Sequence, residues 1–347
     1  SGLCKEFSGT ILALAERLQW PLIAEVGSGL RYTEKSAVRM DCHDAILRSR
    51  FGTQLQPDCI LRFGFASISK ALGKWIANSA KNGRLIAVGN QDICDPEHGA
   101  HMMVNADPNQ FASAVLGHSV PNKQSEPWLS QWREADHAAG KVIRDCARTD
   151  DWEGGIAQTV VEALPDGAAL HVANSMPIRD INSFALPTGR RIAVWSNRGI
   201  NGIDGTLATA AGEAAAQSDV PLVCLVGDLA FLHDLGGLSS IGQSSVTMVV
   251  IDNGGGGVFG FLPISENTAC FEQWFLTPQH LKIEKLCEAA SIRYQAIDDS
   301  MVLKTVLAAE VEREGPCVIH VKTDRIFNAK MHQDTWARVA RVLGGHP

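Results

Sequence analysis

Polar and glycine residues in the second half of the chain directly follow two apolar runs. Asp228 comes just after residues 221–226, and Asn253 and Gly255 come just after residues 246–251. Both runs are short and rich in β-branched residues, which is typical of buried parallel strands whose carboxyl ends share one sheet edge. Open α/β sheets bind ligands at that edge. A carboxylate, an amide oxygen and a Gly carbonyl are hard oxygen ligands that suit Mg²⁺. The spacing therefore predicts a magnesium site that also holds a diphosphate.

Each half of this pattern also has a simpler interpretation. A Gly-Asp pair such as Gly227-Asp228 at a strand end is common in doubly wound folds. The glycine run at 254–257 is, by itself, typical of a mobile turn. Only the two halves together, at this spacing, favour a ligand site.

Two arginines are expected at the same sheet edge. Arg179 follows the strand predicted at 169–173, and Arg198 follows the next predicted strand. A planar guanidinium binds a carboxylate through two parallel hydrogen bonds, which Lys cannot do. The pair therefore indicates a ligand that carries carboxylates. The alternative is that each arginine forms a solvated ion pair, with Asp180 or Asp204.

Two further segments each allow two interpretations. Residues 196–206 are glycine-rich and precede an Ala-rich helix predicted at 207–216. They either present free N–H groups of a helix N-terminus to an anion, or form a tight turn that lets the helix pack closely. Residues 257–263 are largely apolar, and they belong either to the core or to the wall of the predicted pocket.

Composition narrows the class of protein. The 347 residues, 45% hydrophobic and 20% charged, are enough for two globular domains with separate cores. The net charge is −7 and no Lys/Arg cluster alternates with aromatic residues, so no nucleic-acid partner is expected. No apolar run reaches the length of a membrane span, and residues 1–4 lack the order of a signal peptide. Nine cysteines without a C-x-x-C pair suit a reducing compartment, so we expect a cytoplasmic protein.

The order of the apolar runs predicts an α/β fold, with two Rossmann-like three-layer domains and mainly parallel sheets. The first domain is predicted at 1–118, a linker and helix at 119–150, and the second domain at 151–347. In the first domain, strands are predicted at 22–26, 59–64 and 85–89 and helices at 7–18 and 68–80. In the second, strands are predicted at 169–173, 192–195, 222–226, 247–251 and 318–321.

The polar segments that follow the first four of these five strands resemble, taken together, those of one enzyme family. The segments are 174–179, 196–199 with 202–205, 227–229 with 233–234, and 253–255 with 259. They resemble the 2-succinyl-5-enolpyruvyl-6-hydroxy-3-cyclohexene-1-carboxylate synthases of menaquinone biosynthesis, which depend on thiamine diphosphate. Residues 21–25 and 57–64 are similar to the middle domain of that family. The chain departs from the general diphosphate-anchoring signature at Leu229, in place of a Gly, and at Asp252, in place of an Asn.

The resemblance implies a function and a set of cofactors. It implies a thiamine diphosphate-dependent transferase that decarboxylates 2-oxoglutarate and adds the succinyl unit to isochorismate. The implied metal is Mg²⁺, with Mn²⁺ as an alternative cation. The implied metal ligands are Asp228, Asn253 and the Gly255 carbonyl, and the implied substrate-binding residues are Ser175, Arg179 and Arg198.

The resemblance also implies the residues that surround the cofactor. Beside the metal ligands, these are Asn197, Gly202, Ile203, Gly227, Leu229, Gly256, Val258 and Phe259. Ile203 is the expected apolar prop beneath the bent cofactor, and Phe259 is expected to line the pocket near the reacting carbon.

No catalytic acid–base residue is expected within the chain itself. By the resemblance, the activating Glu belongs to a pyrimidine-binding domain outside these 347 residues, supplied by a longer chain or a partner chain, and the enzyme is a homodimer or other homo-oligomer. Two alternatives remain. One is another thiamine diphosphate-dependent oxoacid decarboxylase or carboligase. The other is a non-catalytic half-enzyme that lacks the pyrimidine domain.

Overall fold

The structure, a computed structural model, describes residues 5–90, 95–118, 125–148 and 151–344. It forms two compact units, Ser1–Asp145 with Asp334–Pro347, and Cys146–Gln333. The sequence assigned the C-terminal segment to the second domain, whereas its contacts group it with the first unit: the Arg48 guanidinium lies 3.8 Å from the Trp336 ring centroid. The domain limits predicted from the sequence remain a prediction. Residues 1–4 and the predicted linker residues 119–124 lie outside the described part.

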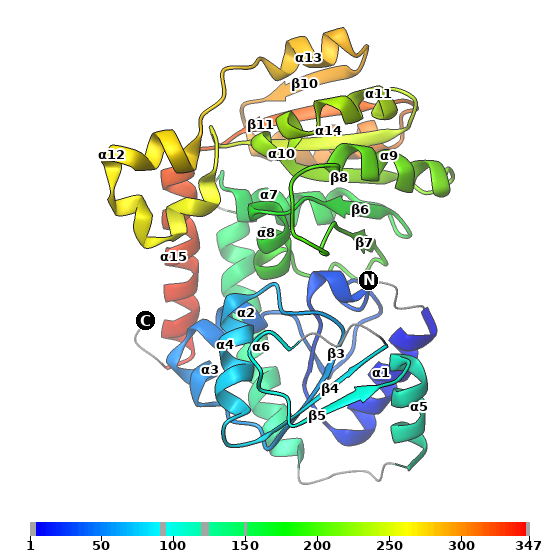
Figure 1. Ribbon diagram of the computed structural model, residues 1–347, viewed down its shortest axis with the longest axis vertical. Coiled ribbons are helices and arrows are strands. Elements are labelled where there is room, and N and C mark those ends of the chain that lie inside the picture. The colour runs from blue at the N-terminus through cyan, green and yellow to red at the C-terminus, as the bar shows by residue number, and fades with distance from the viewer. Residues whose placement is uncertain (1–4, 91–94, 119–124, 149–150, 345–347) are drawn as a thin grey trace. The chain divides into compact units, whose positions relative to one another are not determined.

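The second unit contains a six-stranded sheet in the order β10-β11-β9-β8-β6-β7, in which every pairing is parallel. The strands are β6 (Ala169–Val172), β7 (Ala193–Trp195), β8 (Leu222–Gly227), β9 (Val246–Asp252), β10 (Arg293–Ile297) and β11 (Cys317–Lys322). Because all six run in one direction, their carboxyl ends meet at a single edge, which Figure 1 shows. Strand β8 lies between β6 and β9, so the polar segments after these strands become neighbours.

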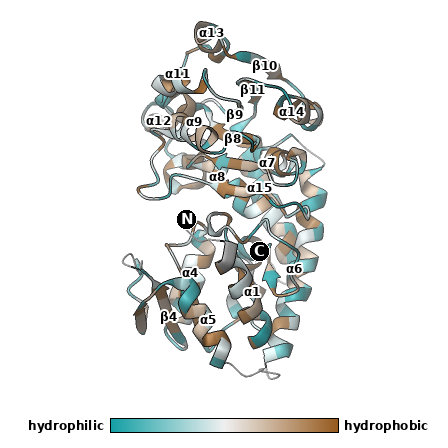
Figure 2. Cartoon of the chain, turned by 90° about the vertical axis from the view of Figure 1, so that its right-hand side faces the viewer, coloured by the Kyte–Doolittle hydropathy of each residue, from teal (hydrophilic) through white to brown (hydrophobic). Residues whose placement is uncertain are grey.

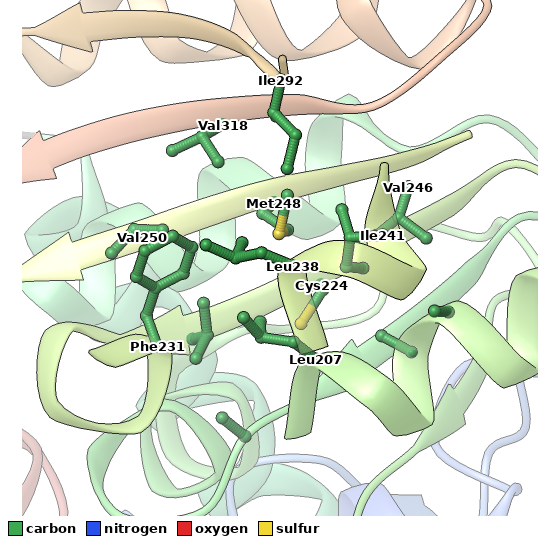
Figure 3. Close-up of a cluster of buried hydrophobic side chains, with 14 of the residues drawn as sticks. Leu207, Cys224, Phe231, Leu238, Ile241, Val246, Met248, Val250, Ile292 and Val318 are labelled. Carbon is green, nitrogen blue, oxygen red and sulfur yellow. The ribbon is translucent and has the colours of Figure 1, made fainter. Parts of the chain in front are cut away.

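The strands form because short β-branched runs can be buried on both faces of a parallel sheet. On one face, alternate residues such as Cys224, Met248 and Val250 pack against Phe231 and Leu238 (Figure 3). Helices α9 (Thr206–Ala216), α10 (Asp228–His233), α11 (Leu238–Ile241) and α13 (Ile283–Ala289) cover this face. Helices α7 (Glu153–Ala163), α8 (Met176–Phe184) and α14 (Leu303–Val311) pack on the opposite face. The unit thus has three layers.

The first unit is built from shorter parallel pairings. The strands are β1 (Leu22–Ile23), β2 (Arg39–Met40), β3 (Cys59–Phe63), β4 (Arg84–Gly89) and β5 (Met102–Asn105). The helices are α1 (Lys5–Leu18), α2 (His43–Arg48), α3 (Arg50–Gln54), α4 (Lys70–Ser79), α5 (Pro108–His118) and α6 (Glu126–Ala147). The apolar side of α1 packs on α5 in a core that contains Phe7, Ile11 and Leu14. The banding of hydrophobic and hydrophilic residues along α6 can be followed in Figure 2.

Shorter elements complete the second unit. They are η3 (Leu235–Gly237), η4 (Gly257–Phe261), η5 (Pro263–Glu266), α12 (Thr268–Phe271), the π-helix η6 (Glu272–Leu276) and η7 (Ser300–Val302). The last helix is α15 (Arg325–Val342), whose residues from Asp334 onward belong to the first unit. The predicted fold class is confirmed: both units combine helices with parallel sheets. The sequence missed strands β2, β5 and β10. No helix in the described part of the chain is long and apolar enough to cross a membrane.

Candidate functional site

Asp228 lies where β8 ends and α10 begins. Its side chain is buried, with 6% of the residue exposed, and its Oδ1 accepts a hydrogen bond of 2.7 Å from the Leu229 N–H. Burial raises the pKa of Asp228 to about 7, and the nearby charge of Asp252 acts in the same direction. Gly227, the last residue of β8, forms the junction with the helix. The carboxyl group is therefore fixed at the sheet edge as predicted.

Asn253 directly follows β9, the strand next to β8. Its Nδ2 donates a hydrogen bond of 2.9 Å to Glu153 Oε1. Its Oδ1 is buried and has no hydrogen-bond partner among the described residues. A buried amide oxygen without a partner is costly, because its desolvation is not compensated. The atom therefore fits a ligand that supplies a positive charge.

Gly255 and Gly256 form a turn in which a larger residue would collide with the neighbouring backbone. Gly255 has φ +136°, and a Cβ placed on it would lie 2.1 Å from the Leu276 carbonyl oxygen. The Gly256 N–H donates a hydrogen bond of 2.7 Å to the same oxygen. This hydrogen bond holds the turn against the end of η6 and fixes the path of the backbone that carries the Gly255 carbonyl.

The donor set fits a hard divalent cation. Asp228 and Asn253 offer side-chain oxygens, and Gly255 offers a carbonyl, from the adjacent ends of β8 and β9. The described residues contain no group of three or more His, Cys, Asp or Glu side chains that could hold a metal. The turn after β9 provides an amide oxygen and a backbone carbonyl oxygen, both of which can bind such a cation.

Asp252 adds a second carboxyl group beside Asp228. The Asp252 charge raises the pKa of Asp228, and a hydrogen bond from His320 lowers the pKa of Asp252. His320 Nε2 lies 2.9 Å from Asp252 Oδ2, and its Nδ1 lies 2.8 Å from the Tyr294 hydroxyl. Of the two carboxyl groups, Asp228 is therefore the one that takes up a proton more readily, and a bound cation would compete with that proton. The sequence pointed to neither His320 nor Tyr294, which lie on β11 and β10.

The two arginines follow neighbouring strands, β6 and β7, and they bond to two adjacent residues, Asn174 and Ser175. Arg198 Nη1 donates a hydrogen bond of 2.6 Å to Asn174 Oδ1, and Arg179 Nη1 donates to the Ser175 carbonyl. Asn174 Nδ2 donates to the carbonyls of Asn197 and Gly202, at 2.7 and 2.6 Å. Asn174 thus holds the Arg198 side chain and the backbone of the same loop at Asn197 and Gly202. The sequence placed Asn174 in a motif but gave it no role.

The ion-pair alternative fails for one of its two acids. Asp180 is fully buried, and its Oδ1 lies 2.7 Å from His332 Nε2. Burial lowers the pKa of His332, but the Asp180 charge, the hydrogen bonds to Asp180 and to the Asn328 carbonyl, and the Glu153 charge together raise it above its ordinary value. Asp180 is therefore part of an internal pair with a residue of α15 and not a solvated surface acid.

Ser175 has an unusual backbone conformation at the start of α8. Its φ is +75° and its ψ is −125°, a region that non-glycine residues rarely adopt. Such strain concentrates at ligand sites, where the surrounding structure enforces it. Here the Arg179 side chain bonds to the Ser175 carbonyl and helps to hold it in place.

Two N–H groups at the α9 N-terminus are not free to bind an external anion, so the anion-binding interpretation is wrong for them. Leu207 and Ala208 donate hydrogen bonds of 2.7 and 3.0 Å to Asp234 Oδ2. An internal carboxylate thus already occupies the positive end of this helix. Gly237 lets the two segments approach, because a Cβ there would lie 2.8 Å from the Ala208 nitrogen. The tight-turn interpretation therefore holds for these groups.

The apolar residues after the glycine turn are half-buried. No residue of η4 is fully buried, and the Phe259 ring meets the Phe275 ring edge-on with 5.6 Å between centroids. This segment, with Val258, is therefore better suited to a pocket wall than to the core. Ile203 is also half-buried, and it packs against the hydrophobic cluster below the sheet edge. The roles predicted for these residues remain predictions.

Comparison with known proteins assigns both halves of the chain to one enzyme class. Residues 2–172 match the family described as "Middle domain of thiamine pyrophosphate", and residues 184–321 match "Thiamine pyrophosphate enzyme, C-terminal TPP binding domain". Relatives named 2-succinyl-5-enolpyruvyl-6-hydroxy-3-cyclohexene-1-carboxylate synthase include those of Geobacillus thermodenitrificans, Rubrobacter xylanophilus and Bacillus velezensis. The first is 36% identical over 97% of this chain and 58% of the relative, the second 34% over 92% and 56%, and the third 30% over 98% and 60%.

These matches confirm the resemblance inferred from the motifs. They also show that the chain spans less than two thirds of the length of these relatives. Thiamine pyrophosphate is another name for thiamine diphosphate.

Proposed function

We infer the function of this chain from the family to which it belongs, the thiamine pyrophosphate enzymes, whose middle and C-terminal domains it contains. We propose that it forms part of a 2-succinyl-5-enolpyruvyl-6-hydroxy-3-cyclohexene-1-carboxylate synthase. The reaction is the decarboxylation of 2-oxoglutarate and the addition of the succinyl unit to isochorismate, with thiamine diphosphate and Mg²⁺ or Mn²⁺. The observation that carries this proposal concerns Asn253 Oδ1, a buried atom without a hydrogen-bond partner among the described residues. Asn253 follows β9, the strand next to the one that ends at the buried Asp228.

Asp228, Asn253 and the Gly255 carbonyl are the proposed ligands of the cation. A cation bound by these oxygens would neutralise the negative charge of the diphosphate. Backbone dipoles alone would do so only weakly. When bound, thiamine diphosphate supplies the stabilisation of a carbanion that decarboxylation and carbon–carbon bond formation require. The cofactor-contacting residues proposed beside the ligands are Asn197, Gly202, Ile203, Gly227, Leu229, Gly256, Val258 and Phe259.

Arg179, Arg198 and Ser175 are the proposed binders of the substrate carboxylates. The two arginines stand at neighbouring strand ends, and Asn174 restrains one guanidinium, so less side-chain freedom is lost when a carboxylate binds. Two positive groups at one edge favour a multiply anionic substrate over the small apolar oxoacids that other enzymes of this class use. The half-buried Ile203 and Phe259 would exclude water from the reacting atoms.

The chain spans less than two thirds of its relatives. We propose that the Glu that activates the cofactor lies in a pyrimidine-binding domain outside residues 1–347. That domain would come from a longer chain or a partner chain, within a cytoplasmic homo-oligomer. By this proposal the chain alone binds the cofactor weakly and shows no carboligation, since acid–base catalysis is worth about 10²–10⁴-fold.

The experiment mixes the purified chain with the pyrimidine-binding domain of one of its relatives. With Mg²⁺, thiamine diphosphate, isochorismate and 2-oxoglutarate, mass spectrometry should detect the succinyl adduct, and Asp228→Ala should remove it. Pyruvate replaces 2-oxoglutarate as the control. Turnover of pyruvate without turnover of 2-oxoglutarate would favour another oxoacid decarboxylase. Cofactor binding without turnover of either substrate would favour a non-catalytic half-enzyme.

A further inference from the structure

Glu153, the first residue of α7, is a buried acid that lies against the proposed metal turn. Only 1% of the residue is exposed. Its Oε1 accepts hydrogen bonds from Asn253 Nδ2, at 2.9 Å, and from the Thr323 hydroxyl, at 3.2 Å. Its own N–H donates to Asn328 Oδ1 at 3.1 Å. Asn253 and Thr323 thus hold the carboxylate, and Asn328 holds the backbone of Glu153.

This contact determines which way the Asn253 amide faces. A carboxamide carries its oxygen and its NH₂ group on opposite sides, and only the NH₂ group can donate to a carboxylate. With Nδ2 against Glu153, Oδ1 must face the other way, and there it is buried without a partner among the described residues. A flipped amide would place its oxygen against the carboxylate oxygen, which is repulsive.

Two neighbours keep the amide from moving away. A Cβ on Gly257 would lie 2.7 Å from Asn253 Nδ2, so the backbone after the turn already closes one side. The Thr323 N–H donates a hydrogen bond of 2.9 Å to the Asp252 carbonyl, while its hydroxyl donates to Glu153. Thr323 therefore ties the end of β9 to the same carboxylate that orients Asn253.

We propose that Glu153 is a positioning residue for the metal site, since it holds the Asn253 amide with Oδ1 directed at the divalent cation. This proposal rests on the proposed function, because it requires that Asn253 Oδ1 binds the cation. Partners that orient metal ligands typically contribute 10–100-fold to metal affinity.

The test separates the position of the acceptor from the charge of the side chain. Glu153→Gln removes the charge and keeps an oxygen at the reach of Asn253 Nδ2. Glu153→Asp keeps the charge and withdraws the oxygen by one methylene. The readout is the affinity for Mn²⁺ of the chain mixed with the pyrimidine-binding domain of a relative, in the presence of thiamine diphosphate, followed by electron paramagnetic resonance of free Mn²⁺. This readout does not depend on catalysis.

We expect Glu153→Asp to weaken Mn²⁺ binding by about 10–100-fold and Glu153→Gln to bind nearly as well as the wild type. Unchanged binding by the folded Asp variant overturns the proposal, and so does binding by the folded Gln variant that is no tighter than that of the Asp variant. Glu310→Asp is the matched control. Glu310, on α14, is also a buried acid, and its carboxylate lies 3.0 Å from the Arg293 guanidinium. This substitution should lower the unfolding temperature and leave the Mn²⁺ affinity unchanged.

Asn253→Ala separates this proposal from the proposed function. If Asn253→Ala leaves Mn²⁺ affinity unchanged, the ligand assignment itself is wrong. If it weakens binding while Glu153→Asp does not, the ligand assignment stands and only the positioning role of Glu153 is lost.

Discussion

Substitutions of Gly254 and Gly255, two adjacent glycines in the turn proposed to bind the metal, should have very different effects. Gly254 has φ +78°, and a Cβ on it would meet only the Arg325 side chain, at 4.0 Å. Gly255 has φ +136°, and a Cβ on it would lie 2.1 Å from the Leu276 carbonyl oxygen and 3.0 Å from its carbon. Both positions strain an alanine, but only Gly255→Ala also collides with backbone.

The expected magnitudes follow from these contacts. An alanine in the left-handed region at Gly254 costs roughly 1–2 kcal/mol. At Gly255 the φ lies outside that region and costs about 1–3 kcal/mol. Relief of the collision also breaks the hydrogen bond from Gly256 to Leu276, worth about 0.5–1.5 kcal/mol. The strained backbone carries the proposed carbonyl ligand, so we expect the strain to weaken binding. A loss of about 2–4 kcal/mol in the binding free energy corresponds to roughly a 30- to 1,000-fold weaker cation-dependent affinity for the cofactor.

Isothermal titration calorimetry of thiamine diphosphate at saturating Mg²⁺ measures this loss, and thermal unfolding of each variant measures the accompanying change in stability. Gly255→Ala should weaken binding far more than Gly254→Ala. Equal losses in the two variants, or a larger loss at Gly254, would show that the Gly255 carbonyl and its turn are not part of the site.

Three further predictions concern other parts of the chain. Arg179→Ala and Arg198→Ala should each lower kcat/KM for a carboxylate substrate by roughly 1.5–3 kcal/mol in the complete enzyme, with cofactor affinity unchanged; normal kcat/KM in both variants would remove their role. Asp234→Ala should destabilise the second unit by about 0.5–2 kcal/mol, because the α9 N-terminus loses its acceptor, and urea unfolding at neutral pH measures this. Burial lowers the pKa of His43 from 6.5 to about 4, so the neutral ring contributes stability above pH 6.5 that is lost as pH falls through 4. The loss is up to about 3 kcal/mol, and His43→Gln should reduce the difference in unfolding free energy between pH 7 and 4; an unchanged difference would contradict the assignment.

The sequence predicted the parts of the site that depend on local pattern. The apolar runs of β8 and β9 identify buried parallel strands, and the residues directly after them must share an edge, which brings Asp228 and Asn253 together. Strands β5 and β10 were missed because they are largely exposed or half-buried, and neither contains an apolar run as long as those of β8 and β9.

The partners that orient the site residues depend on tertiary packing. Glu153 reaches Asn253 across 100 residues of sequence, and Asp234 reaches the α9 N-terminus across 26 and 27. No spacing rule connects such residues, because their proximity is set by which helix covers which face of the sheet. For the same reason the sequence could not show that an internal carboxylate already occupies the α9 N-terminus.

The most direct test of the proposed site is a crystal structure of the chain with thiamine diphosphate and Mn²⁺, in which anomalous scattering locates the cation. The proposal predicts one Mn²⁺ at about 2.0–2.2 Å from an Asp228 carboxylate oxygen, Asn253 Oδ1 and the Gly255 carbonyl oxygen, with diphosphate oxygens completing its shell. A cation bound elsewhere, or a diphosphate held without Asp228 and Asn253, would contradict it.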